Sequence, residues 1–498
     1  MSGIKSLAKD TAIYGVSSIV GRFLNWMLVP LYTNMFPVAE YGVVTLVYAV
    51  VALALVILTY GMETGFFRFA NHERWSDPME VYSTSLISLA VSSTAFIALV
   101  AAFLPQAAAA LECPGRPSFV MIMAVCVAMD AFMTIPYSYL RFRKRPMRFA
   151  LLRLVNIGLN IGLNLFFILL CPLLYRHFPD IVSRFYDPSY GIGYIFLSNL
   201  IASAVNLLMM VPELRGFGWK FNIRLWREML VYSAPLLVLG VAGIMNQTID
   251  KMLFPHLVSD PADATYQLGI YGANYKIGIL LLVFLQAFRF AYEPFVFARG
   301  KSNGGDKQAY SDAMKYFVAF ALFIFLGVMF YLDIVRYLIS PRYFSGLVVV
   351  PVIMLGELFF GIFYNLSIWY KLTDRTVWGA RFSLAGLAVT VTLNVILVPR
   401  IGYMGCAVAA LCSYGTMMVA SYIIGRRYYP VDYKLRRLAL YFCLAAALYA
   451  AGVYALPLLG LHAAVNGLVR AALLAAFAAA FVRIEHISPK ALVPRRGK

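Results

Sequence analysis

The sequence predicts an all-α polytopic membrane protein, and three observations support this fold class. Only 13% of the 498 residues are charged, about half the share in a soluble globular protein. The mean hydropathy is +0.77. Apolar runs long enough to cross a bilayer recur along the chain, and they are continuous, unlike the alternating strands of a membrane β-barrel.

Fourteen apolar runs are expected to form transmembrane helices, and an even number places both termini on one side of the membrane. The first run is too long for a signal-peptide core and has no convincing cleavage site. The runs cover residues 11–35, 40–61, 80–104, 118–140, 149–173, 190–212, 229–250, 266–290, 314–334, 343–366, 376–398, 402–425, 437–457 and 462–482.

Basic residues alternate between the connections of these runs. The two tails and every second connection hold 29 Lys and Arg, whereas the opposite connections hold 6. Because Lys and Arg resist translocation, the basic side is expected to be cytoplasmic, with both termini there. Topology also explains the short basic runs without nucleic acid as a partner, and attraction to anionic membrane lipids is an added effect.

An internal repeat relates the two halves of the chain. Tyr41-Gly42, Glu63 and Asn164 each recur 230 residues later, on the corresponding helix of a six-helix unit. Six is an even number, so the halves are expected to be parallel repeats about an axis along the membrane normal. The predicted parts are an N-lobe at 1–217, a C-lobe at 218–428, and two final helices with a basic cytoplasmic tail at 429–498.

Several motifs made mainly of Gly, Pro and Tyr resemble a known family. They are Pro30–Gly42 (PLYTNMFPVAEYG), Gly61–Arg68 (GMETGFFR), Tyr232–Pro235 (YSAP), Asp250-Lys251 and Gly269–Tyr275 (GIYGANY). Over about residues 5–425 the chain resembles the polysaccharide biosynthesis, or O-antigen-type, flippases of the multidrug/oligosaccharidyl-lipid/polysaccharide exporter superfamily. Family members often have Arg where this chain has Lys251, a departure that preserves the charge.

The resemblance implies a function, a substrate and a location. It implies a flippase that moves undecaprenyl-pyrophosphate-linked oligosaccharide, an O-antigen or a capsule or exopolysaccharide repeat unit, across the bacterial inner membrane by alternating access. A polysaccharide polymerase and chain-length machinery are further candidate partners. Neither a cofactor nor a metal is expected, because the six cysteines have no metal or redox spacing and no P-loop is present.

Cations inside the apolar runs are the candidate substrate-binding residues. Arg22 and Lys276 lie near the middle of their helices, where an unpaired cation costs about 2.5–3.5 kcal/mol on the insertion scale. Each is expected to bind an anionic group. The alternative for Arg22 is an ion pair with Glu357 or Asp130, and for Lys276 it is an ion pair with a neighbouring carboxylate. Asp250 and Lys251, near the outer end of their helix, are candidates for a cavity or gate role. As neighbours they point about 100° apart, so they are not expected to face each other.

The remaining candidates lie near helix ends or carry a carboxyl group. Arg153, Arg381 and Arg289 are candidates for a basic entrance that captures a lipid pyrophosphate, with snorkelling to headgroups as the alternative. Asp130 and Glu357 are candidates for proton or cation coupling. Asn160 and Asn164 share a helix face, where interhelical hydrogen bonding is expected.

Two other functions compete with a flippase. A cation-coupled multidrug exporter of the same superfamily would need an acidic cavity, whereas Arg22 and Lys276 are basic. A polytopic polymerase or ligase would need a large outer loop with catalytic residues, and the longest outer connection covers only residues 174–189. The chain is therefore expected not to be an enzyme.

Overall fold

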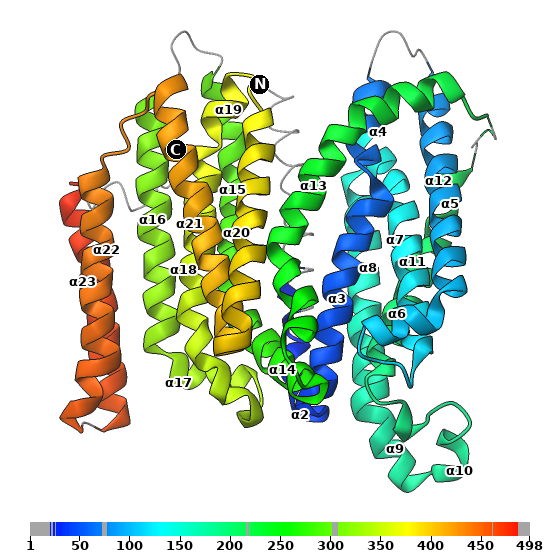
Figure 1. The fold of residues 1–498 in the computed structure, drawn as a ribbon, viewed down its shortest axis with the longest axis horizontal. Helices are drawn as coiled ribbons and strands as arrows, with labels where there is room; N and C mark the ends of the chain where they lie inside the picture. The colour runs from blue at the N-terminus through cyan, green and yellow to red at the C-terminus, as the bar shows by residue number, and fades with distance from the viewer. Residues whose placement is uncertain are drawn as a thin grey trace, which may run out of the picture. The chain divides into compact units, whose positions relative to one another are not determined.

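A computed structural model describes residues 20, 23–24, 26–71, 77–215, 218, 220–300, 307–460 and 462–486. Over these ranges the regular secondary structure is helical and contains no strand (Figure 1). The predicted fold class is thus confirmed: the chain is an all-α membrane protein.

Eleven of the helices in the described ranges are long and apolar enough to cross a membrane, or twelve if a broken pair, Pro261–Gly278 with Leu280–Arg289, is one span. The run predicted at 190–212 is a shorter apolar helix, Gly193–Met209. About half of the first predicted run, 11–35, lies outside the described residues. The count of fourteen spans therefore stays a prediction.

The chain forms two compact units. The first unit contains residues Met1–Lys276 and Ser383–Ala410. The two six-helix lobes expected at 1–217 and 218–428 stay a prediction. The helices of the first unit are α2 (Val29–Met35), α3 (Val38–Thr59), α4 (Met62–Ala70), α5 (Pro78–Ala102), α6 (Leu104–Ala110), α7 (Pro117–Phe142), α8 (Pro146–Leu165), α9 (Cys171–His177), α10 (Pro179–Val182), α11 (Gly193–Met209), α12 (Val211–Leu214), α13 (Ile223–Leu257), α14 (Pro261–Gly278, up to Lys276), and parts of α20 (Val377–Ile401) and α21 (Tyr403–Tyr428).

Local sequence explains where these helices begin and end. Asp77 caps α5 by accepting a hydrogen bond from the Met79 amide at 2.9 Å, and Asn222 caps α13, as short polar side chains do at helix N-termini. Proline occupies the first turn of α5, α7 and α8, where its missing N–H is not needed. Left-handed residues Tyr60 and Gly61 separate α3 from α4.

The core of the first unit joins α4, α5 and α13. Met62, Phe66, Tyr82, Leu89 and Met229 are completely buried there. Rings pack edge to face within the cluster, with the Phe66 and Tyr82 centroids 6.2 Å apart. This packing holds α13, which carries Asp250 and Lys251, against α4 and α5.

The second unit contains residues Ile277–Phe382 and Leu411–Lys498. Its core packs α15, α16 and α18 closely, and a Cβ added to Gly361 would lie 2.2 Å from the ring of Phe317. Its helices are α15 (Leu280–Gly300), α16 (Lys307–Phe330), α17 (Leu332–Val335), α18 (Val350–Leu366), α19 (Ile368–Leu372), α22 (Leu435–Tyr449), α23 (Ala463–Ile484) and the remaining parts of α20 and α21.

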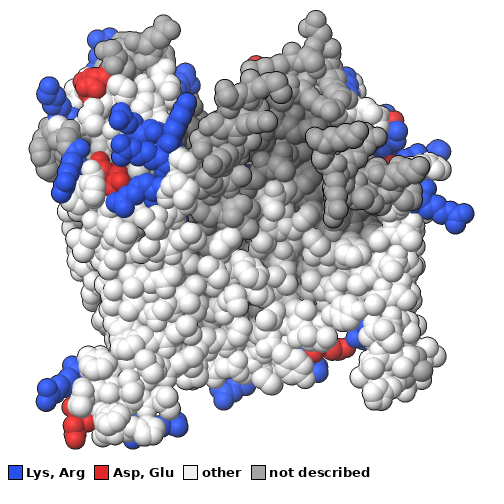
Figure 2. All heavy atoms as spheres, turned by 180° about the vertical axis from the view of Figure 1, so that it is seen from behind, with Lys and Arg blue, Asp and Glu red and all other residues white. Residues whose placement is uncertain are grey.

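The distribution of charge on the surface fits a bilayer. On the face in Figure 2, Lys and Arg side chains gather toward the helix ends and leave a broad uncharged band between them. Large apolar residues are exposed along the helices, including Val231 with 77% of its surface accessible. Such a band would be unfavourable in water and is the surface expected to contact lipid.

Candidate functional site

A buried polar cluster joins α13 and α14. The Lys251 ammonium donates to both carboxylate oxygens of Asp250 at 3.1 Å and to the Gln247 carbonyl at 2.9 Å. The Tyr271 hydroxyl donates to Asp250 at 2.7 Å. The Lys251 ammonium also lies 3.9 Å from the centre of the Tyr275 ring, within cation–π range. The two charges therefore neutralise each other.

The expectation that Asp250 and Lys251 do not face each other is wrong. Their Cα–Cβ bonds do diverge on the helix, but a lysine side chain has a flexible four-carbon stem. The stem lets the ammonium reach back to the carboxylate. Because both side chains are more than 90% buried, an unpaired charge there would be costly.

Glycines bring α14 against α3 in this region. A Cβ added to Gly42 would lie 1.9 Å from the Thr265 carbonyl oxygen, and one added to Gly269 would lie 2.0 Å from that of Val38. Only residues without a side chain allow the two backbones to come this close. The Gly269–Tyr275 motif thus both packs α14 and supplies the tyrosines of the cluster.

Lys276 directly follows Tyr275, near the end of α14. It is half-buried, and across the described residues its ammonium has neither an ion pair nor a hydrogen bond. The Trp26 indole donates to the Lys276 carbonyl at 2.8 Å. The positive charges of Lys251 and Lys276 repel each other. The helix breaks just after Lys276, at Ile279. Arg22, the other predicted midspan cation, lies outside the described residues.

A second buried polar group contains the candidate coupling residue Asp130. Ser203 on α11 donates to the Asp130 carboxylate on α7 at 2.9 Å. Arg153 on α8 lies 4.1 Å over the ring of Tyr137, and its positive charge attracts the Asp130 carboxylate. The structure thus brings Asp130 and Arg153, which were predicted for separate roles, into one group.

The predicted hydrogen bonding of Asn160 and Asn164 is confirmed. The Asn164 amide donates to the Asn160 side-chain oxygen at 3.0 Å, and Tyr32 on α2 donates to the Asn164 oxygen at 2.9 Å. The pair therefore joins α2 to α8.

Three predicted residues lie in the second unit. Arg289 lies 4.2 Å over the Tyr364 ring, and Arg381 lies 4.8 Å over the Trp378 ring. Arg153 and Arg381, at nearly equivalent repeat positions, thus both lie over aromatic rings. Glu357 on α18 is buried, with 3% of its surface exposed.

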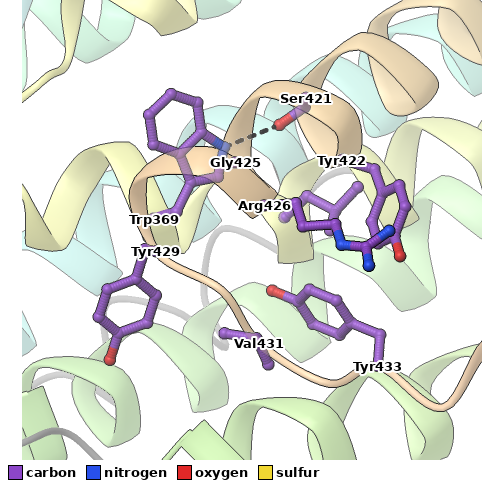
Figure 3. A pocket seen from close by; sticks show the side chains of 9 residues that line it. Trp369, Ser421, Tyr422, Gly425, Arg426, Tyr429, Val431 and Tyr433 are labelled. Atoms are coloured by element: carbon purple, nitrogen blue, oxygen red, sulfur yellow. Dashed lines mark hydrogen bonds between the residues drawn. The ribbon is translucent and has the colours of Figure 1, made fainter.

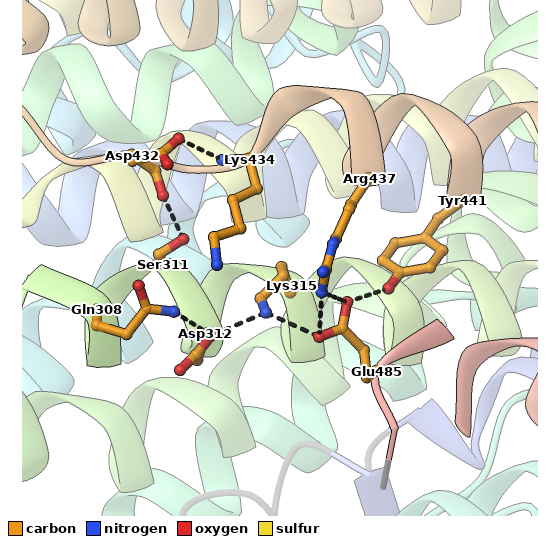
Figure 4. Close-up of polar contacts among 9 residues, drawn as sticks. All are labelled: Gln308, Ser311, Asp312, Lys315, Asp432, Lys434, Arg437, Tyr441 and Glu485. Carbon is orange, nitrogen blue, oxygen red and sulfur yellow. Dashed lines mark hydrogen bonds and ion pairs between the residues drawn. The ribbon is translucent and has the colours of Figure 1, made fainter. Parts of the chain in front are cut away.

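A third polar cluster, around Glu485, could not be found from the sequence. Lys315 on α16 donates to Glu485 at 2.8 Å, and Arg437 on α22 donates at 3.1 Å (Figure 4). Tyr441 also donates to this carboxylate. Burial raises the pKa of Glu485, but these hydrogen bonds and the Lys315 charge outweigh it and hold the pKa below the usual 4.5. The cluster ties the end of α23 to α16 and α22.

One aromatic pocket lies where α19 meets the end of α21. The Trp369 indole donates to the Ser421 hydroxyl at 3.2 Å (Figure 3), and the Trp369 ring stacks on Tyr428. The cavity volume is about 10 Å³, enough for a single water molecule at most. This pocket therefore holds no organic substrate. Over the described residues, no group of three His, Cys, Asp or Glu side chains could bind a metal.

Comparison with known proteins gives a family and a fold. The family model of the polysaccharide biosynthesis protein matches residues 7–292. The solved structure of the lipid II flippase MurJ in an inward closed conformation aligns with a TM-score of 0.69 and 14% identity, covering 94% of this chain and 98% of that one.

An inward-facing multidrug resistance MATE family transporter of the MOP superfamily aligns with a TM-score of 0.66 and 12% identity, covering 87% and 99%. No curated protein matches the sequence significantly. At these identities the solved structures show a shared fold. Because the family match covers more than half of the chain, the chain belongs to the polysaccharide biosynthesis protein family.

Proposed function

We propose that this protein is a flippase for undecaprenyl-pyrophosphate-linked oligosaccharide, an O-antigen or a capsule or exopolysaccharide repeat unit, and that it works by alternating access. The family match over residues 7–292 carries this proposal. The fold shared with a lipid II flippase supports it. The protein acts in this account as a transporter of the bacterial inner membrane, with both termini in the cytoplasm.

The charge of the candidate site supports an anionic substrate. Lys251 is neutralised by Asp250, so Lys276 is the intramembrane cation that we assign to the pyrophosphate. An ammonium that no carboxylate neutralises can bind and release an anion. We further propose that the pyrophosphate contacts Arg22 and that the Asp250–Lys251 pair belongs to a gate.

The remaining candidates have separate proposed roles. Arg153, Arg289 and Arg381 each help to capture the lipid pyrophosphate, and a cation–π contact orients each guanidinium group. Asp130 and Glu357 couple transport to a proton or another cation, since buried carboxyl groups can titrate near neutrality. A polysaccharide polymerase and chain-length machinery would receive the product.

The second candidate function is a cation-coupled multidrug exporter. The fold shared with MATE transporters favours it. Drug cations need a negative site, however, and Lys276 supplies a positive one. A deletion strain distinguishes the two functions.

The strain is complemented with wild-type protein, Lys276→Gln or Lys276→Arg. A flippase predicts that deletion removes surface glycan and leaves lipid-linked glycan on the cytoplasmic leaflet. Lys276→Arg should restore export and Lys276→Gln should not, at equal protein levels in the membrane. Unchanged surface glycan together with increased drug sensitivity would instead establish the exporter.

A further inference from the structure

A polar pocket lies at the C-terminal end of α7, and none of the residues assigned to transport lines it. Its volume is about 230 Å³. Arg143 and Arg145 line it from the α7–α8 connection, and Arg215 lines it from the end of α12. Tyr139 and Pro212 contribute to its walls. We call it the arginine pocket.

The carboxylate of the arginine pocket is already neutralised. Glu213 is buried and receives hydrogen bonds from the Arg148 guanidinium at 3.1 and 3.5 Å. The guanidinium also donates to the Met209 carbonyl at 2.6 Å. Among the described residues, Arg143, Arg145 and Arg215 have no carboxylate partner. The pocket is therefore strongly positive.

Backbone geometry fixes two of these arginines. Lys144 has a left-handed φ of 52°, and the Arg145 amide donates to the Leu140 carbonyl at 2.9 Å. This is a common way to end a helix. Pro146 then starts α8 directly, so its positive N-terminal end lies beside the pocket. The connection is thus a short, ordered turn.

The position of the arginine pocket indicates its ligand. It lies at the ends of membrane-length helices, where lipid headgroups reside, and Figure 2 shows basic side chains gathered at helix ends of this kind. Guanidinium groups bind phosphate through paired hydrogen bonds. Basic pockets between transmembrane helices bind the headgroups of anionic lipids.

We propose that the arginine pocket binds the phosphate headgroup of an anionic phospholipid. The three guanidinium groups contact phosphate oxygens, while Tyr139 and Pro212 pack against the glycerol. The neutralised Glu213 adds no repulsion. This site does not depend on the proposed transport function.

The test measures lipid retained by the full-length protein after purification in mild detergent. Cardiolipin, phosphatidylglycerol and phosphatidylethanolamine are added in equal amounts, and bound lipid is counted by native mass spectrometry. The wild type should retain one cardiolipin or phosphatidylglycerol molecule and no phosphatidylethanolamine. The triple variant Arg143→Gln/Arg145→Gln/Arg215→Gln should bind that lipid about 100-fold more weakly, given three lost charge contacts.

A matched control removes the same charge from a neighbouring surface of the same unit. Lys220, Arg224 and Arg227 are exposed on the α12–α13 connection and the start of α13, and their triple Gln variant should bind lipid like the wild type. An equal loss of lipid binding in both triple variants would mean that lipid is attracted by surface charge in general, and it would overturn the proposal. So would binding of inorganic pyrophosphate, but not lipid, that depends on the pocket arginines.

Discussion

The Asp250–Lys251 pair gives the sharpest test of the α13–α14 cluster. Asp250→Asn would leave the Lys251 ammonium buried without a countercharge, and removing one partner of a buried pair costs about 3–5 kcal/mol. Lys251→Met should cost less, because the Asp250 carboxylate keeps the Tyr271 hydroxyl at 2.7 Å. The double variant Asp250→Asn/Lys251→Met should be nearly as stable as the wild type, because neither charge remains buried.

The assay is the unfolding of purified protein in mixed detergent, followed by tryptophan fluorescence. Four proteins complete a double-mutant cycle, which isolates the coupling between the two side chains. The expected coupling is at least about 2 kcal/mol. If the free energy of unfolding of Asp250→Asn is within about 0.5 kcal/mol of the wild-type value, then Lys251 is hydrated and does not need Asp250 as a countercharge.

Three further perturbations test packing, the Glu485 cluster and substrate charge. Gly269→Ala should sharply lower the stability of the protein, because the new Cβ would lie 2.0 Å from the Val38 carbonyl oxygen. The control Gly162→Ala, at a position with open space around it, should stabilise the protein by about 1 kcal/mol. Normal stability of Gly269→Ala would refute the close approach of α3 and α14. Glu485→Gln should lower the free energy of unfolding by about 1.5–3 kcal/mol at pH 7. Because the folded-state pKa of Glu485 is below 4.5, the difference in stability from the wild type should persist above that pH and vanish as the pH falls through the folded pKa. A difference in stability that does not change with pH would contradict this. Lys276→Gln should reduce glycan export and Lys276→Arg should preserve it, as measured by surface glycan at equal protein levels. Equal export by both variants would show that a cation at position 276 is not needed.

Periodicity and length predicted most of the fold, because a bilayer demands long apolar helices. Every apolar run predicted from residue 40 onward overlaps a helix. The shared helix face of Asn160 and Asn164 was predicted as well, since a spacing of four residues places side chains on one face. These features depend on local sequence alone.

The contacts that shape the site depend on side-chain flexibility and long-range packing instead. Helical geometry placed Asp250 and Lys251 apart, but the lysine stem bends back to the carboxylate. Lys315, at the start of the predicted run 314–334, is buried against Glu485, 170 residues away. Neither spacing nor composition marks such a partner.

The central claim is that the protein moves an anionic, lipid-linked glycan, and reconstitution tests it most directly. Purified protein is placed in vesicles that contain a polyprenyl-pyrophosphate-linked oligosaccharide, and an impermeant glycosidase is added outside. Wild-type protein should make the inner-leaflet fraction of the glycan accessible, and Lys276→Gln should slow this strongly. Accessibility equal to that of protein-free vesicles, together with uptake of a cationic drug by the same vesicles, would contradict the account.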